Sequence, residues 1–283
     1  MVELSYDGSF EGLLGVLAAV VCRGAPLPDR IRRLWPEGEP DQPDLFGPGG
    51  GDCPPRIESP SGASISSGAF GGFEETFFEL SVGAYDRFRC GWMSEFPIEA
   101  ACVRFGSRVF AAARAAAERA GAGLGSAEAR EAAERASRPG GPFPGDDAVL
   151  TVLSAAAKVR READRLCGFL RFREDERGTF VARCTPDHFV LPLLAAPFSR
   201  RFAGAPWLII DEKRALCLHG GGTAEPRIFA AALPPADQGG DPWEDLWRLY
   251  HRSINNPSRN NPGLQRQFIP GRYRKYLPEL DRP

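Results

Sequence analysis

The sequence contains few residues of the kinds that usually bind metals. Among its 283 residues there are 3 histidines, and its 7 cysteines are scattered without forming any C-x-x-C pair. Zinc ribbons, iron–sulfur clusters and a disulfide framework are therefore not expected. We expect no metal site and no cofactor.

Several other patterns are also missing. No run of eighteen apolar residues occurs, so we expect no membrane partner. The first residues, VELSYDGS, lack the basic and apolar regions of a signal peptide, which favours a cytoplasmic protein. The phosphate-binding loop, the dinucleotide fingerprint, G-x-S-x-G and H-E-x-x-H are absent, and these absences exclude the simplest assignments to nucleotide-binding, hydrolase and metalloprotease classes.

Basic charge is unevenly distributed along the chain. Only 3 of the 35 basic residues are lysines, and the net charge is −2. Residues 1–60 carry ten acidic and five basic residues, whereas 251–276 carry six basic residues and no acidic one. This asymmetry predicts a local basic patch near the C-terminus.

We expect a single domain over residues 1–283 with a Pro/Gly-rich insert at about 36–72. A sub-division into a mainly helical part, 1–145, and an α+β part, 146–283, is also possible. A helix is predicted from about Asp146 to Leu166, and an amphipathic helix at 243–254.

Between these two helices the pattern indicates a sheet. Strand-like segments at 169–174 and 179–185 are followed by a short helix at 191–202 and a hairpin at 207–221. The predicted fold class is α+β, with an antiparallel sheet whose core has the order strand-strand-helix-strand-strand and is packed with surrounding helices.

Two groups of residues could carry function in this part of the chain. Arg171 and Arg173 alternate along a predicted strand, so their face either meets phosphates or is the solvent side of a half-buried strand. Asp187 and His188 precede a helix, where they could act as an acid–base pair or cap the helix and bind local backbone.

The C-terminal stretch NNPSRNNPGLQRQFIPGRYRKYLPEL mixes arginines with aromatic residues. Arginine makes charge-assisted hydrogen bonds to phosphate, and aromatic rings stack on exposed bases. The basic residues proposed to contact nucleic acid are Arg266, Arg272, Arg274 and Lys275. The apolar residues could instead anchor the tail on the core; they are Leu264, Phe268, Ile269, Tyr273, Tyr276 and Leu277.

An ordered set of motifs gives a family resemblance. GFLRFRE, TPDHFVLPLL, PWLIID, the C-terminal stretch and the N-terminal YDGSFEGLL resemble a bacterial family of unknown function described as probable DNA-metabolism proteins. The resemblance implies partnership with a radical-SAM protein that modifies or repairs DNA. It also adds Arg201 and Arg214 to the residues expected to contact DNA. The sequence differs from the family where Asp164, Pro197 and Ile210 replace histidines.

We therefore expect a DNA-binding accessory protein that acts with a radical-SAM enzyme in DNA repair or modification. One alternative is a DNA-base glycosylase or hydrolase that uses Asp187 and His188. Another is a protein–protein adaptor without direct DNA contact. The chain lacks a radical-SAM cysteine triplet, so it is not itself the radical-SAM enzyme.

Overall fold

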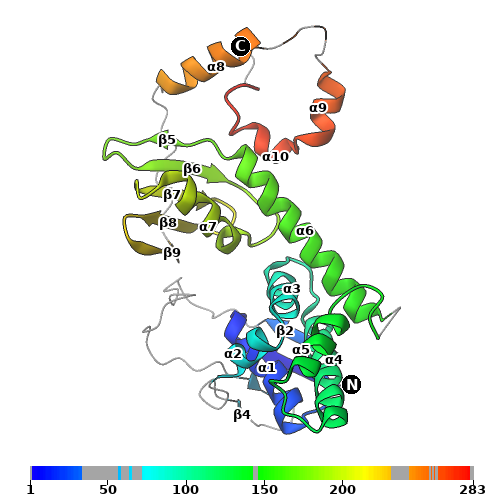
Figure 1. The fold of residues 1–283 in the computed structure, drawn as a ribbon. Helices are drawn as coiled ribbons and strands as arrows, with labels where there is room; N and C mark the ends of the chain where they lie inside the picture. Colours follow the sequence, from blue (N-terminus) through cyan, green and yellow to red (C-terminus); the bar gives the residue numbers. More distant parts are fainter. Residues whose placement is uncertain are drawn as a thin grey trace. The chain divides into compact units, whose positions relative to one another are not determined.

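The computed structural model describes residues 2–33, 57–58, 64–65, 72–142, 146–230, 242–254, 256, 258 and 261–280. These residues form two compact units, one ending at Arg160 and the other beginning at Arg161 (Figure 1). Most of the predicted insert at 36–72 lies outside the described residues. The expectation of a single domain over 1–283 stays a prediction.

The first unit begins with a strand and a buried helix. Strand β1 (Glu3–Tyr6) lies between β2 (Arg30–Arg33) and β3 (Ile57–Glu58), and β4 (Ser64–Ile65) follows β3. Helix α1 (Phe10–Arg23) starts at Ser9, whose side chain accepts a hydrogen bond from the Gly12 amide over 2.9 Å. Such a cap satisfies one of the free amides of the first turn.

The described residues of the first unit contain four further complete helices, α2 (Phe73–Leu80), α3 (Val82–Met93), α4 (Glu99–Ala120) and α5 (Ala127–Ala136). Of these, α2, α3 and α4 contact α1. Aromatic side chains fill the space between them, and the rings of Phe77 and Phe110 lie 5.2 Å apart. Burying such rings is a large stabilising contribution in a small helical unit.

Helix α6 (Asp147–Phe169) contributes residues to both units. Asp146 precedes it and accepts hydrogen bonds from the amides of Ala148 and Val149. The helix continues to Phe169, so part of the strand predicted at 169–174 is helical. Only Arg173–Glu174 form a strand, β5. Arg171 therefore lies between α6 and β5 rather than on a strand face with Arg173.

The second unit contains a five-stranded sheet in the order β5-β6-β7-β8-β9. Strand β6 (Phe180–Cys184) is followed by helix α7 (Leu191–Phe202), and then by β7 (Trp207–Asp211), β8 (Leu216–Gly221) and β9 (Ala224–Ala230). The prediction of an antiparallel sheet is wrong for β6 and β7, which pair in parallel. Helix α7 connects these two strands as a crossover, which returns the chain in the same direction. Strand β9 was also not predicted.

In the described part of the chain after β9, the structure has helices α8 (Pro242–Ile254), α9 (Pro262–Phe268) and α10 (Gly271–Arg274). The prediction that apolar residues anchor the tail is confirmed for Tyr273 and Leu277, each 1% exposed. Leu264 and Phe268 are instead exposed. Among the residues described, no helix is both long and apolar enough to cross a membrane.

Candidate nucleic-acid interface

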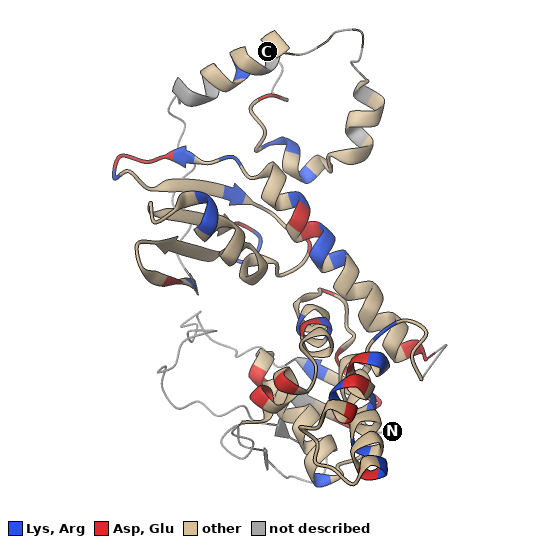
Figure 2. Cartoon of the chain, viewed as in Figure 1, with Lys and Arg blue, Asp and Glu red and all other residues tan. Residues whose placement is uncertain are grey.

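A buried carboxylate, Glu162 on α6, lies at the centre of the contacts made by the C-terminal segment. Its side chain is 6% exposed. It accepts hydrogen bonds from the Tyr273 hydroxyl over 2.6 Å and from the Arg272 guanidinium over 3.0 Å. In Figure 2 the basic α10 lies beside α6. Glu162 therefore joins α10 to α6.

The same carboxylate also holds the loop between β6 and α7. The amides of Asp187 and His188 donate to its two oxygens over 2.9 and 2.8 Å. Burial raises the pKa of Glu162, but the hydrogen bonds from Tyr273 and the two amides outweigh this effect, and the net pKa is lowered. Glu162 is thus ionised at neutral pH, and its charge is balanced by Arg272.

A second carboxylate, Asp211 at the end of β7, organises the neighbouring turn. It is fully buried and pairs with Arg214 over 2.7 Å. Burial raises its pKa, and Arg214 opposes this shift. Arg214 and Lys213 also donate to the backbone carbonyl of Asp187 over 2.8 and 2.9 Å. Arg214, a predicted phosphate contact, therefore also joins the β7–β8 turn to the loop after β6.

Glu212 and Glu279 bind further basic residues of the predicted interface. Glu212 pairs with Arg183 over 3.2 Å and with Lys275 over 3.0 Å. Glu279 accepts hydrogen bonds from Arg171 over 2.6 Å and from the Trp247 indole over 3.1 Å. Lys275 and Arg171 thus also have partners within the chain.

Arg272 has two acidic partners. Besides Glu162 it pairs with the Asp187 carboxylate over 2.7 Å, and its guanidinium lies 4.8 Å from the centre of the Tyr273 ring. Burial alone lowers the pKa of Arg272, but contacts with Tyr273 and Asp187 produce a net increase. Arg272 is held in place by the fold.

Two predicted contacts, Arg201 and Arg274, have no ion pair among the described residues. Arg201 is exposed on α7, 5.8 Å from the centre of the Phe172 ring. Arg274 is half-buried, and its Nη2 is buried without a hydrogen-bond acceptor. Arg173 has interactions within the chain. Arg266 lies on α9, and its side chain is outside the described part of the structure.

The proposed acid–base pair does not share one environment. The Asp187 side chain is 56% exposed and bound to Arg272, whereas His188 is 8% exposed. Their backbone amides bind the side chain of Glu162, which is distant in sequence. The predicted cap is not formed, because helix α7 has Val190 at its N-cap and no side-chain hydrogen bond there. A catalytic role for the side chains stays a prediction. Among the described residues, no group of three or more His, Cys, Asp or Glu could hold a metal ion.

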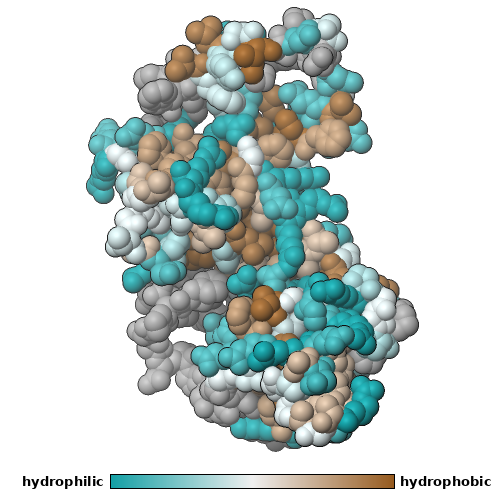
Figure 3. Space-filling model, viewed as in Figure 1, coloured by the Kyte–Doolittle hydropathy of each residue, from teal (hydrophilic) through white to brown (hydrophobic). Residues whose placement is uncertain are grey.

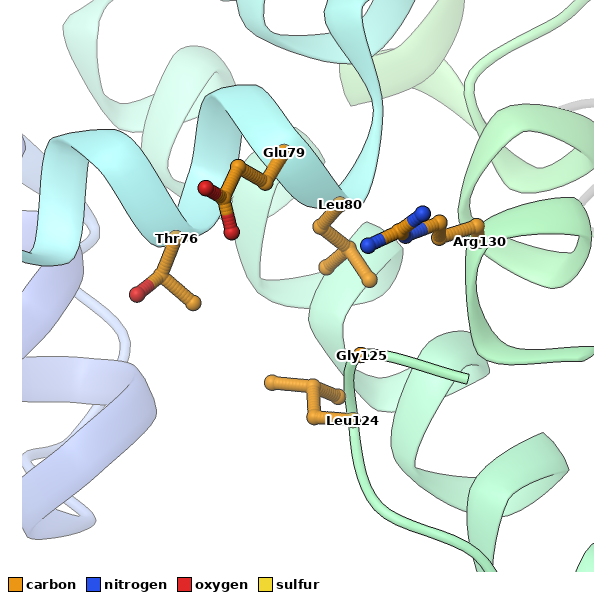
Figure 4. Close-up of a pocket in the computed structure, with 6 residues that line it drawn as sticks. All are labelled: Thr76, Glu79, Leu80, Leu124, Gly125 and Arg130. Atoms are coloured by element: carbon orange, nitrogen blue, oxygen red, sulfur yellow. The ribbon is translucent and has the colours of Figure 1, made fainter. Parts of the chain in front are cut away.

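A small hollow lies in the first unit, away from the predicted site residues. It has a volume of about 50 Å³ and is formed by α2, α5 and the loop before α5 (Figure 4). Its lining consists of Thr76, Glu79, Leu80, Leu124, Gly125 and Arg130.

Sequence reasoning missed the carboxylates that organise this region. The sequence did indicate that Glu162 is buried. Glu162 lies three residues after Val159 and four before Leu166, which places it on the same side of the helix as these two buried residues. A carboxylate on the buried side of a helix needs partners.

The fold and these contacts define an α+β domain whose C-terminal segment is held on helix α6 by the buried Glu162 and beside the sheet by the half-buried Glu212. Residues 141–279 match a family described as a domain of unknown function, DUF4130, so this part of the chain is a DUF4130 domain. No curated protein and no solved structure matches the chain.

Proposed function

We propose that the protein is a DNA-binding accessory protein that acts with a radical-SAM enzyme in DNA repair or modification. The resemblance of its motifs to probable DNA-metabolism proteins suggests the process and the partner. The local basic composition of the C-terminal segment suggests the ligand.

The observation that carries DNA contact is the guanidinium of Arg274. This side chain is half-buried and has no carboxylate partner among the described residues. A phosphate oxygen would balance its charge, because guanidinium and phosphate form charge-assisted hydrogen bonds.

Arg272 and Lys275 help to position this contact without being free themselves. Their pairs with Glu162 and Glu212 fix α10 and the residue that follows it on the domain. Arg274 is then presented by an anchored segment rather than by a loose tail. Ordering a binding group before it meets its ligand reduces the entropy lost on binding.

The test is DNA binding as a function of salt. Fluorescence anisotropy would be recorded with a fluorescein-labelled duplex and with its single strand, between about 50 and about 200 mM salt. We expect affinity to fall linearly with salt on logarithmic axes, with a slope of about −0.9 per phosphate contacted on the duplex. Folded protein that does not bind either probe at low salt would refute the proposal and leave the adaptor role.

Partnership with the radical-SAM enzyme is tested separately by co-purification of the two proteins after nuclease treatment. Deleting residues 255–283 is a poor variant for this purpose, because it removes Arg272 and Tyr273 from Glu162. If the intact chain does not co-purify with the enzyme, with or without DNA, this result would contradict the partnership.

A further inference from the structure

Five aromatic side chains of the second unit gather on one face of its sheet. Phe180 of β6 and Trp207 of β7 are register partners, so their side chains lie on the same face. On α7, the ring centre of Phe202 lies 5.1 Å from that of Phe180, and the ring centre of Phe198 lies 6.2 Å from that of Trp207. Phe172, which precedes β5, has its ring centre 4.7 Å from that of Phe202. We call these five side chains the aromatic cluster.

The aromatic cluster is only partly covered by the rest of the unit. Phe198 and Trp207 are buried, whereas Phe172, Phe180 and Phe202 are half-buried. In the space-filling view, brown hydrophobic surface lies beside teal hydrophilic surface over the region of β5, β6 and α7 (Figure 3). The three half-buried residues therefore keep part of their surface accessible to a ligand.

Arg201 places a positive charge against the aromatic cluster. It follows Phe198 by three residues, so the two side chains lie on the same side of α7. The guanidinium lies 5.8 Å from the ring centres of Phe172 and Phe198 and 6.0 Å from that of Phe202. Arg201 is exposed and has no ion pair among the described residues. Its charge is therefore available to a ligand that also contacts the rings.

A ligand that suits this surface has a flat ring beside an anionic group. A nucleotide has both, because its base stacks on aromatic side chains and its phosphate forms charge-assisted hydrogen bonds with arginine. In a duplex the faces of the bases are covered by their neighbours, so only an unpaired base can stack on a protein ring. An apolar segment of a partner protein would cover the rings but leave the Arg201 charge unbalanced.

We propose that the aromatic cluster and Arg201 form a stacking site for an unpaired base of single-stranded DNA. The base lies against the accessible rings of Phe172 and Phe202, and the adjoining phosphate pairs with Arg201. This inference rests on the proposed function and names the form of DNA that the protein binds.

The experiment separates base stacking from phosphate contact by comparing two strands that have the same phosphates. Fluorescence anisotropy is recorded at low salt with a fluorescein-labelled oligothymidylate of about 12 nucleotides and with an abasic strand of the same length. We expect wild type to bind the oligothymidylate about tenfold more tightly than the abasic strand, because the abasic strand has no bases to stack.

The variants identify the rings that bind the base. Phe172→Leu and Phe202→Leu should each reduce the ratio of the two affinities at least threefold, whereas Phe172→Tyr, which keeps a ring, should preserve it. Phe229→Leu is the matched control with an unchanged ratio, because Phe229 is 42% exposed on β9 and lies on the opposite face of the sheet from Trp207. Arg201→Gln should weaken both strands by a similar factor. Circular dichroism verifies that each variant is folded.

The possible failures are distinguishable. Wild type that binds both strands equally, with affinity that falls as salt rises, would overturn the stacking site and leave DNA binding intact. A ratio that survives both leucine variants would also overturn the stacking site. Wild type that binds neither of these strands nor a duplex at low salt would overturn the proposed function as well.

Discussion

The hydroxyl of Tyr273 donates a hydrogen bond of 2.6 Å to Glu162, although the two residues are 111 positions apart in the chain. The same carboxylate accepts the amides of Asp187 and His188. One buried charge on α6 therefore holds both the C-terminal segment and the loop after β6.

Replacing Glu162 with glutamine should destabilise the protein strongly. The carboxylate has four donors, and a glutamine would direct its NH₂ group at some of them and leave Arg272 without this buried partner. We expect a loss of about 3–5 kcal/mol in the free energy of unfolding, measured by urea denaturation. The control is Asp164→Asn, an exposed position on the same helix, for which the change should stay within about 0.5 kcal/mol. Equal effects of the two variants would show that Glu162 is not the anchor.

The contribution of Glu162 should depend on pH in a defined direction. Its folded-state pKa is lowered, so its charge stabilises the fold above the ordinary glutamate pKa of about 4.3, and this stabilisation is lost as pH falls through the folded value. The difference in unfolding free energy between wild type and Glu162→Gln should thus be constant near neutral pH and shrink below about pH 4. Urea denaturation at several pH values measures this gap. A gap that widens on acidification would contradict the assignment.

Removing only the hydroxyl of Tyr273 gives a milder test. Tyr273→Phe keeps the ring that packs 5.7 Å from Phe169 and loses one hydrogen bond to a charged acceptor. We expect a loss of about 1.5–3 kcal/mol and faster proteolytic cleavage within 261–280. Tyr276→Phe, whose hydroxyl bonds to the more exposed Glu212, should cost less. The reverse order would argue against Glu162 as the main anchor.

Arg201 should contribute to DNA binding without stabilising the fold through an ion pair. Arg201→Gln is expected to weaken binding uniformly across DNA sequences and to reduce the salt slope by about one. Arg177→Gln is the matched control, because Arg177 is also exposed and has no ion pair among the described residues. Equal effects of the two variants would indicate a general charge effect rather than a contact by Arg201.

The local sequence pattern predicted individual helices and strands better than it predicted their arrangement. The predicted helix 191–202 agrees with α7, and the hairpin 207–221 agrees with β7 and β8. Strand direction was missed because an alternating pattern is the same in parallel and antiparallel pairs. The end of α6 was predicted too early, although the Leu170 amide still bonds to the Leu166 carbonyl.

For the candidate site, the sequence predicted the basic residues but not their partners. Arg272 and Lys275 were expected to face phosphate, and the structure pairs them with Glu162 and Glu212. These acidic partners are far away in sequence, so composition within 251–276 could not indicate them. Only the tertiary structure shows that Arg272 and Lys275 are paired with carboxylates, whereas Arg274 has no ion pair among the described residues.

The most direct test compares Arg274→Gln with Arg272→Gln by urea denaturation and by DNA binding as a function of salt. Arg274→Gln should leave the free energy of unfolding within about 0.5 kcal/mol of wild type, because it removes no ion pair, while reducing the salt slope by about one. Arg272→Gln should instead lower stability by about 3 kcal/mol, because it breaks the pair with buried Glu162. An Arg274→Gln variant with the DNA affinity and the salt slope of wild type would contradict the proposed DNA contact.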